Sequence, residues 1–94
     1  MEEFRIASSQ KLNHEFEELC AQAESDRRGL FALETAQEIM RNLQKDATTV
    51  GEPLYNLKHL KLQMRLVLVF PWSIHFAVDE ARRIVYLSRI ALMR

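Results

Sequence analysis

Hydrophobic residues in the first half of the chain recur with the period of an α-helix. The first stripe has the spacing i, i+4, i+7, i+8 and consists of Leu12, Phe16, Leu19, Cys20 and Ala23. The second stripe consists of Leu30, Leu33, Ala36, Ile39, Met40 and Leu43. Ser8-Ser9 and Ser25-Asp26 precede the two stripes with side chains that cap helices. The pattern predicts two successive helices, with a short strand over residues 3–7 before them.

The second half of the chain changes to the period of a β-strand. Apolar residues alternate with other residues over three segments, at residues 60–69, 72–79 and 84–90. Phe70-Pro71 predicts the first turn between them, because proline cannot donate a hydrogen bond inside a central strand. Residues 79–82 predict the second turn, and residues 46–52, followed by Pro53, predict a loop after the second helix.

The predicted element order is β-α-α-β-β-β. It indicates an α+β fold in which a helical hairpin packs on a small antiparallel sheet, in two layers and as a single domain over residues 1–94. Residues 66–69 are apolar at every position, so we expect the second face of the sheet to be partly covered as well. A terminus, a dimer mate or another protein chain would serve as that cover.

The charges change the picture when the two halves are counted separately. The 94 residues carry 13 basic and 13 acidic groups, and the isoelectric point near 6.8 argues against a strongly basic nucleic-acid binder, whose value typically exceeds ~9. Residues 1–50 have a net charge of −4 and residues 51–94 a net charge of +4. The asymmetry indicates either a functional basic face or an acidic helical layer over a basic sheet.

Other residue types exclude several classes of protein. Cys20 is the only cysteine, which excludes an intramolecular disulfide and favours the reducing cytoplasm. The longest uncharged apolar run, residues 66–72, is far shorter than the ~20 residues that span a bilayer, so we expect no membrane segment. His14 and His59 lack partners at metal-ligand spacing, and no cofactor motif is present, so we predict no metal and no cofactor.

Three segments, residues 51–57, 66–80 and 83–90, resemble the RelE/ParE toxin superfamily of bacterial toxin–antitoxin systems. The family has a helical hairpin, a Gly-x-x-Leu loop and a strand meander, and here Gly51-Glu52-Pro53-Leu54 occupies the position of that loop. The order and lengths of the elements match over nearly the whole chain. The resemblance implies an antitoxin as partner, and as target either ribosome-bound mRNA, which RNA-cleaving members cut, or a topoisomerase.

The residues that RNA-cleaving members use are largely replaced. Their aromatic–arginine pair at the start of the third strand corresponds to Trp72-Ser73, and their late arginine segment keeps only Arg94. Their late tyrosine would lie beyond Arg94, while Arg65 falls near a family lysine. Loss of one preorganised cation commonly lowers the rate ~10²–10³-fold. The resemblance therefore implies action by binding rather than by strong RNA cleavage, and we assign no catalytic residue.

Three functional hypotheses follow. The first is a RelE/ParE-like toxin, or a toxin-derived protein, that acts by binding. The second is a non-toxic protein-interaction or homodimerisation module on the same fold. The third is an mRNA endoribonuclease that uses Lys61, Arg65, His75 and Arg89, although we expect His75 to be a half-buried structural residue. The predicted contact site for nucleic acid or an acidic partner is a basic sheet face with Lys58, Lys61, Arg65, Arg89 and Arg94.

Overall fold

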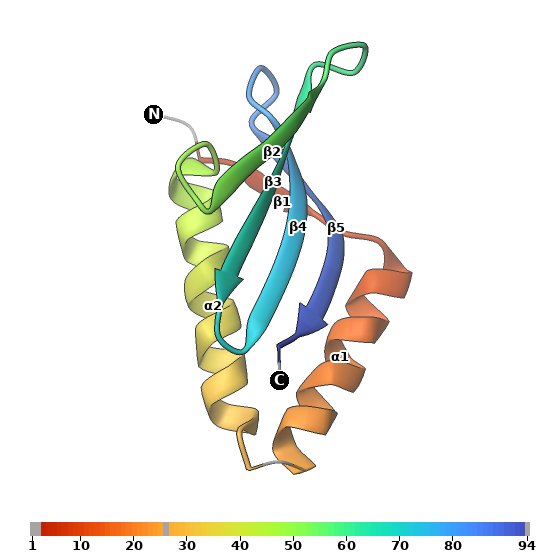
Figure 1. Cartoon of the computed structure of the whole chain (residues 1–94), viewed down its shortest axis with the longest axis vertical. Helices are drawn as coiled ribbons and strands as arrows, with labels where there is room; N and C mark the ends of the chain where they lie inside the picture. Colours follow the sequence, from red (N-terminus) through yellow and green to blue (C-terminus); the bar gives the residue numbers. More distant parts are fainter. Residues whose placement is uncertain (1–2, 26, 94) are drawn as a thin grey trace.

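In the computed structural model, which describes residues 3–25 and 27–93, a helical hairpin packs on one face of a five-stranded sheet (Figure 1). The elements in chain order are β1 (Arg5–Ala7), α1 (Gln10–Ser25), α2 (Gly29–Asp46), β2 (Glu52–Leu57), β3 (Leu62–Val69), β4 (Trp72–Asp79) and β5 (Ile84–Leu92). α1 packs against β5, and α2 packs against β1 and β4. The predicted α+β class is confirmed, with the order β-α-α-β-β-β-β.

The sheet has one more strand than the sequence pattern predicts. Its strands lie in the order β1-β5-β4-β3-β2, and β1 runs parallel to β5 while all other pairs are antiparallel. The additional strand is β2, which the pattern assigned partly to a loop. Pro53 is compatible with β2 because this strand lies at the sheet edge, where one side of the backbone needs no ladder partner. The register shifts between Pro53 and Tyr55, which leaves Leu54 as an extra residue.

The two helices start in different ways. The hydroxyl of Ser9 accepts a hydrogen bond from the backbone N–H of Leu12 at 3.1 Å, so the predicted cap of α1 is present. α2 begins at Gly29 without a side-chain cap, and the Ser25 hydroxyl donates to the carbonyl of Ala21 within α1 instead. Asp26, the other predicted cap residue, lies outside the described residues.

Trp72 joins the helices to the sheet. Its side chain is fully buried, and its indole Nε1 donates a hydrogen bond to the carbonyl oxygen of Ala32 in α2 at 2.7 Å. Its ring stacks on Phe16 of α1, with the two ring centroids 5.3 Å apart. The other large side chains that are fully buried with it are Phe76, Leu43, Ile74 and Val85. Trp72, the first residue of β4, is therefore a central residue of the core.

Candidate functional site

The side of the sheet that faces away from the helices carries the candidate site, and we call it the open face. Strand register places one residue each from β2, β3, β4 and β5 in a row across it: Tyr55, Met64, Ala77 and Tyr86. Met64 and Ala77 are buried between the tyrosines, whereas Tyr55 is 57% exposed. Neighbouring side chains therefore cover the middle of this row, although neither helix lies over it (Figure 1).

A second row on the open face is polar and runs next to the tyrosines. It consists of Glu52, Leu66, His75 and Arg89, again in cross-strand register from β2 to β5. His75 is half-buried, as expected, and its Nδ1 atom is buried without a hydrogen-bond partner among the described residues. The exposed side chain of Arg89 is its direct cross-strand neighbour. This row brings an imidazole and a guanidinium together.

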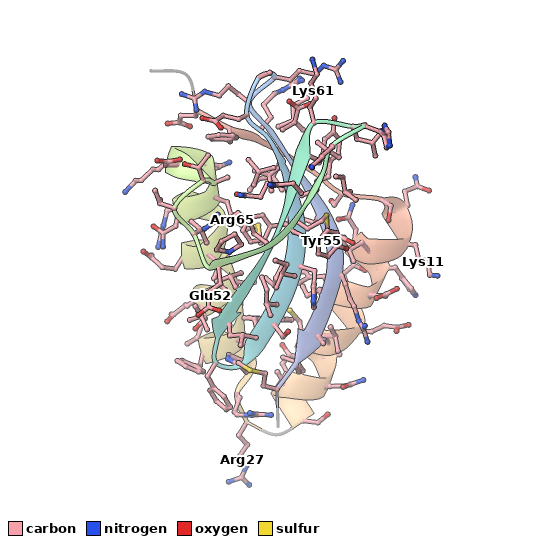
Figure 2. All side chains as sticks on the ribbon, turned by 45° about the horizontal axis from the view of Figure 1, so that its top comes forward. Lys11, Arg27, Glu52, Tyr55, Lys61 and Arg65 are labelled. Carbon is pink, nitrogen blue, oxygen red and sulfur yellow. The ribbon has the colours of Figure 1, made fainter. Side chains whose placement is uncertain are left out.

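The lysines of the predicted site lie at the end of the sheet, away from Arg89. Lys58 and Lys61 belong to the turn between β2 and β3, where they line a pocket of about 260 Å³ together with Glu80. Figure 2 shows Lys61 at this end of the sheet. Lys61 precedes Leu66 by five residues, whereas Leu66 pairs with His75, which in turn pairs with Arg89. Five residues along a strand correspond to about 17 Å, so the lysines and Arg89 do not form one cluster.

Arg65 does not lie on the open face, so the expected basic sheet face is not formed by all of its predicted cations. Its cross-strand partner is Phe76, a core residue, so Arg65 points to the helix-covered side of the sheet and is only 6% exposed. Its Nε donates to the carbonyl of Val50 at 2.9 Å and its Nη2 to that of Gly51 at 3.1 Å. Its Nη1 donates to Gln63 Oε1 at 2.8 Å. Arg65 is therefore engaged in holding the loop before β2 (Figure 2).

The remaining predicted cation is Arg94, and it lies outside the described residues. Of the five predicted cations, Lys58 and Lys61 share one pocket and Arg89 lies on the open face. Tyr55 is a residue of this face that the sequence reasoning missed, because no strand was predicted between the loop at residues 46–52 and the segment 60–69. The signal that could have found it is the pair Tyr55 and Leu57, which keeps the period of two.

A separate exposed patch lies where the β3–β4 turn meets the start of α2. We call this patch the apolar tip, and it consists of Phe31, Val69 and Phe70, all exposed. The rings of Phe31 and Phe70 lie 6.3 Å apart, and the guanidinium of Arg28 lies 5.5 Å from the Phe70 ring centroid. Apolar side chains gathered on the surface are typical of protein contacts.

Cys20 and the acidic groups offer little further chemistry. Burial, together with the charge of Glu24, raises the pKa of the half-buried Cys20 thiol, which keeps it protonated and unreactive. Within residues 3–25 and 27–93, no three His, Cys, Asp or Glu side chains lie together as metal ligands. In the same part of the chain, no helix is long and apolar enough to cross a membrane.

The open face can therefore bind but is poorly equipped for cleavage. Its imidazole–guanidinium pair suits a phosphate or a carboxylate, and its tyrosines suit a nucleobase or an apolar side chain. In comparisons with protein-family models, with curated proteins and with solved structures, the chain matches none.

Proposed function

We propose that this chain is a RelE/ParE-like toxin, or a toxin-derived protein, that acts by binding its target in the cytoplasm. The observation that carries the proposal is the open face, where two tyrosines lie in the row beside His75 and Arg89. Aromatic rings next to a cation are suited to nucleic acid and to acidic protein surfaces alike. The target is ribosome-bound mRNA or a topoisomerase, and an antitoxin would cover the same face.

The distribution of cations supports binding over strong RNA cleavage. Attack by a 2′-hydroxyl needs a base, an acid and cations around the charged transition state. Arg89 is the cation in register with His75, while Arg65 is held by three hydrogen bonds on the opposite side of the sheet. The lysines of the β2–β3 turn lie about 17 Å along the sheet from that row. A single guanidinium can contact a phosphate, but it does not surround one.

Induced expression in a bacterial host tests the proposal. Expression of the wild-type chain should arrest growth, and Arg89→Ala and Tyr55→Ala should each relieve the arrest because they remove open-face contacts. Arg82→Ala and Leu60→Ala are matched controls, since both side chains are exposed on turns and lie off the open face. Growth unaffected by the wild-type chain would contradict a toxic function in that host.

Two further readouts separate the targets and the mechanism. Primer extension on translating mRNA should show no new cuts, and a supercoiling assay with purified topoisomerase tests the second target. New cuts that disappear in a His75→Gln variant would favour the endoribonuclease hypothesis instead. If growth is arrested but neither translation nor topoisomerase activity is inhibited, the open face acts on a different target.

The apolar tip favours a second candidate function, a homodimerisation or protein-interaction module. Phe31 is 49% exposed, and the tip places three apolar side chains together on the surface. Light scattering after size-exclusion chromatography should then give a dimer that Phe31→Ser and Val69→Ser convert to a monomer. Leu60→Ser, which changes an exposed leucine on the β2–β3 turn, should leave the dimer intact. A wild-type monomer at micromolar concentration would contradict homodimerisation.

A further inference from the structure

β5 extends well beyond the strand that covers its outer edge. β1 pairs through Arg5, Ile6 and Ala7 with the first three residues of β5, whereas β5 continues to Leu92. Within the described part of the chain, nothing pairs with the outer edge of β5 over residues 87–92. Such an edge presents unpaired backbone N–H and C=O groups, which can accept another strand.

The opposite edge of the sheet, formed by β2, is less suited to pairing with a strand of another chain. β2 carries Pro53, which has no N–H to donate, and an extra residue, Leu54, that interrupts its ladder. Proline and bulges at an edge strand disfavour pairing with another chain. The β5 edge lacks such a proline, although its own register with β4 shifts at Ser88, and its last residues lie beside α1.

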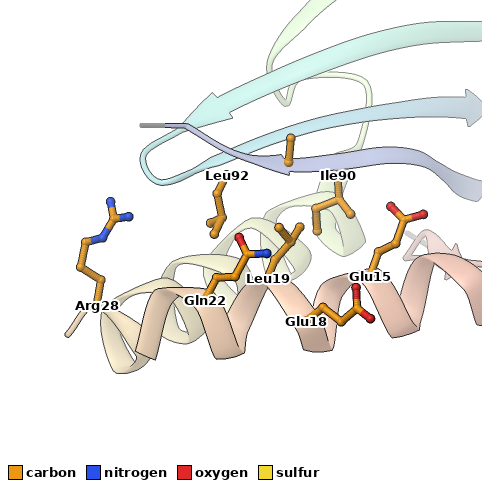
Figure 3. Close-up of a pocket in the computed structure, with 8 residues that line it drawn as sticks. Glu15, Glu18, Leu19, Gln22, Arg28, Ile90 and Leu92 are labelled. Atoms are coloured by element: carbon orange, nitrogen blue, oxygen red, sulfur yellow. The ribbon is translucent and has the colours of Figure 1, made fainter. Parts of the chain in front are cut away.

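A groove of about 740 Å³ lies between this edge of β5 and α1 (Figure 3). Leu19 of α1 and Ile90 and Leu92 of β5 give it an apolar centre. Glu15 and Glu18 of α1 lie at one end of the groove and Arg28 at the other, so only the first end is acidic. Glu18 Oε1 also lies 3.1 Å from the Nε2 atom of His14 on the exposed helix surface. An added strand would lie about 4.8 Å from β5, which places it along this groove.

We propose that the β5 edge and this groove bind an extended peptide segment of a partner protein by strand addition. Backbone pairing with residues 87–92 supplies affinity, and alternate side chains supply specificity. Side chains two residues apart point to the same face of a strand. The segment therefore turns an apolar side chain toward Leu19 and, two residues away, a basic side chain toward Glu15 and Glu18. This site is independent of the open face and of the function proposed for it.

A designed peptide tests the proposal directly. The probe has eight residues and blocked ends, with threonine at every second position and lysine and leucine alternating between them. Fluorescence anisotropy of the labelled probe should give saturable binding, and binding should slow amide hydrogen exchange over residues 87–92. Replacing its lysines by glutamates, or methylating alternate backbone nitrogens, should each weaken binding about tenfold or more, because the first removes the charge complement and the second the donors.

Variants of the protein give the matched comparison. Glu15→Lys combined with Glu18→Lys should weaken binding of the lysine probe about tenfold and strengthen binding of the glutamate probe. Glu17→Lys combined with Glu34→Lys makes the same change of net charge at exposed helix positions outside the groove and should leave the affinity unchanged. Circular dichroism on all variants checks that the helices remain folded.

Three results would overturn strand addition by a basic peptide. The first is equal affinity for the lysine and glutamate probes, and the second is binding without protection of residues 87–92. The third is a dimer in which those same amides are already protected without the probe, since a second copy of the chain would then occupy the edge. The growth assay with open-face variants tests the proposed function, and the peptide assay tests the β5 edge. Either proposal can therefore be contradicted without the other.

Discussion

The guanidinium of Arg65 donates three hydrogen bonds, two of them to the carbonyls of Val50 and Gly51. These carbonyls belong to the loop between α2 and β2, and the bonds tie this loop to β3. A buried charge is costly unless its donors are satisfied, and those of Arg65 are met mostly by backbone oxygens. Its contribution is therefore to stability, and Arg89 remains the exposed guanidinium of the open face.

Arg65→Ala should lower the free energy of unfolding by about 1–3 kcal/mol, because a buried side chain is removed and three partly buried hydrogen bonds, to two loop carbonyls and to Gln63, are lost. Arg89→Ala should change it by less than about 0.5 kcal/mol, as expected for an exposed side chain. Urea denaturation of the two variants beside the wild type measures both values. Similar small effects for both arginines would contradict the structural role of Arg65.

Asp46 gives a pH-dependent prediction. The Thr48 hydroxyl and then the Thr48 backbone N–H donate to its carboxylate, which lowers the pKa of Asp46 below its ordinary value of 3.8. A lowered pKa stabilises the folded state above pH 3.8, and this stabilisation is lost as the pH falls through the folded-state value. Asp46→Asn should thus lower Tm at pH 7, and the difference should shrink toward about pH 2. Glu34→Gln, an exposed helix position, is the control in the thermal melts. A difference that is constant with pH would contradict the assignment.

Among the elements, β2 depends most on tertiary contacts. It follows Gly51, which has a φ of +68°, and a Cβ atom at this position would lie 2.2 Å from the carbonyl oxygen of Leu66. Glycine is therefore required both by the left-handed backbone and by the close approach of β3. The strand is placed by this contact and by Arg65, and its own pattern of apolar residues contributes less.

Gly51→Ala should lower the free energy of unfolding by at least about 1–3 kcal/mol, the range for a non-glycine residue in a strained backbone conformation. The overlap with Leu66 adds to this effect, since the contacted atom belongs to the backbone of a paired strand. Glu52→Ala, at the next and exposed position, should have little effect. Urea unfolding of both variants measures the difference, and a stable Gly51→Ala protein would show that the loop can move away from β3.

At the scale of the whole molecule, one core joins all the layers. Trp72 contacts Phe16 of α1, donates to Ala32 of α2 and lies in β4, so a single side chain touches both helices and the sheet. A chain of 94 residues with one such core is expected to unfold in a single cooperative transition. The environment of the only tryptophan then changes together with the helices.

Urea unfolding followed by tryptophan fluorescence and by far-ultraviolet circular dichroism should give coincident transitions. The heat-capacity change should be about 1.1–1.4 kcal/mol/K, as expected for this chain length. Trp72→Phe is a useful comparison, because it removes the hydrogen bond to Ala32 and should lower stability by about 1–3 kcal/mol. A fluorescence transition that precedes the loss of helix would show that the sheet and the helices unfold separately.

The sequence predicted the helices, the last three strands and the two turns between those strands, since each has a strong local signal. The stripes of α1 and α2 and the alternation in β4 lie within the observed elements, although Leu30 and Leu33 at the start of α2 are exposed and Ala32 is buried instead. It missed β2, because an edge strand with Pro53 has weak alternation and is held by its neighbour. It also grouped Arg65 with the exposed cations, because its charge favours an exposed position. Strand register instead pairs Arg65 with Phe76 on the helix-covered side.

The local pattern of apolar residues was sufficient to determine the α+β class and the helical hairpin. Periodicity reports which side of an element is buried, and that information is contained in short stretches of the chain. The tertiary structure alone decided which side chains meet. Cross-strand register aligned His75 with Arg89 and the two tyrosines with each other, and the short pairing of β1 exposed the edge of β5. Such alignments join residues far apart in the chain, so no local pattern encodes them.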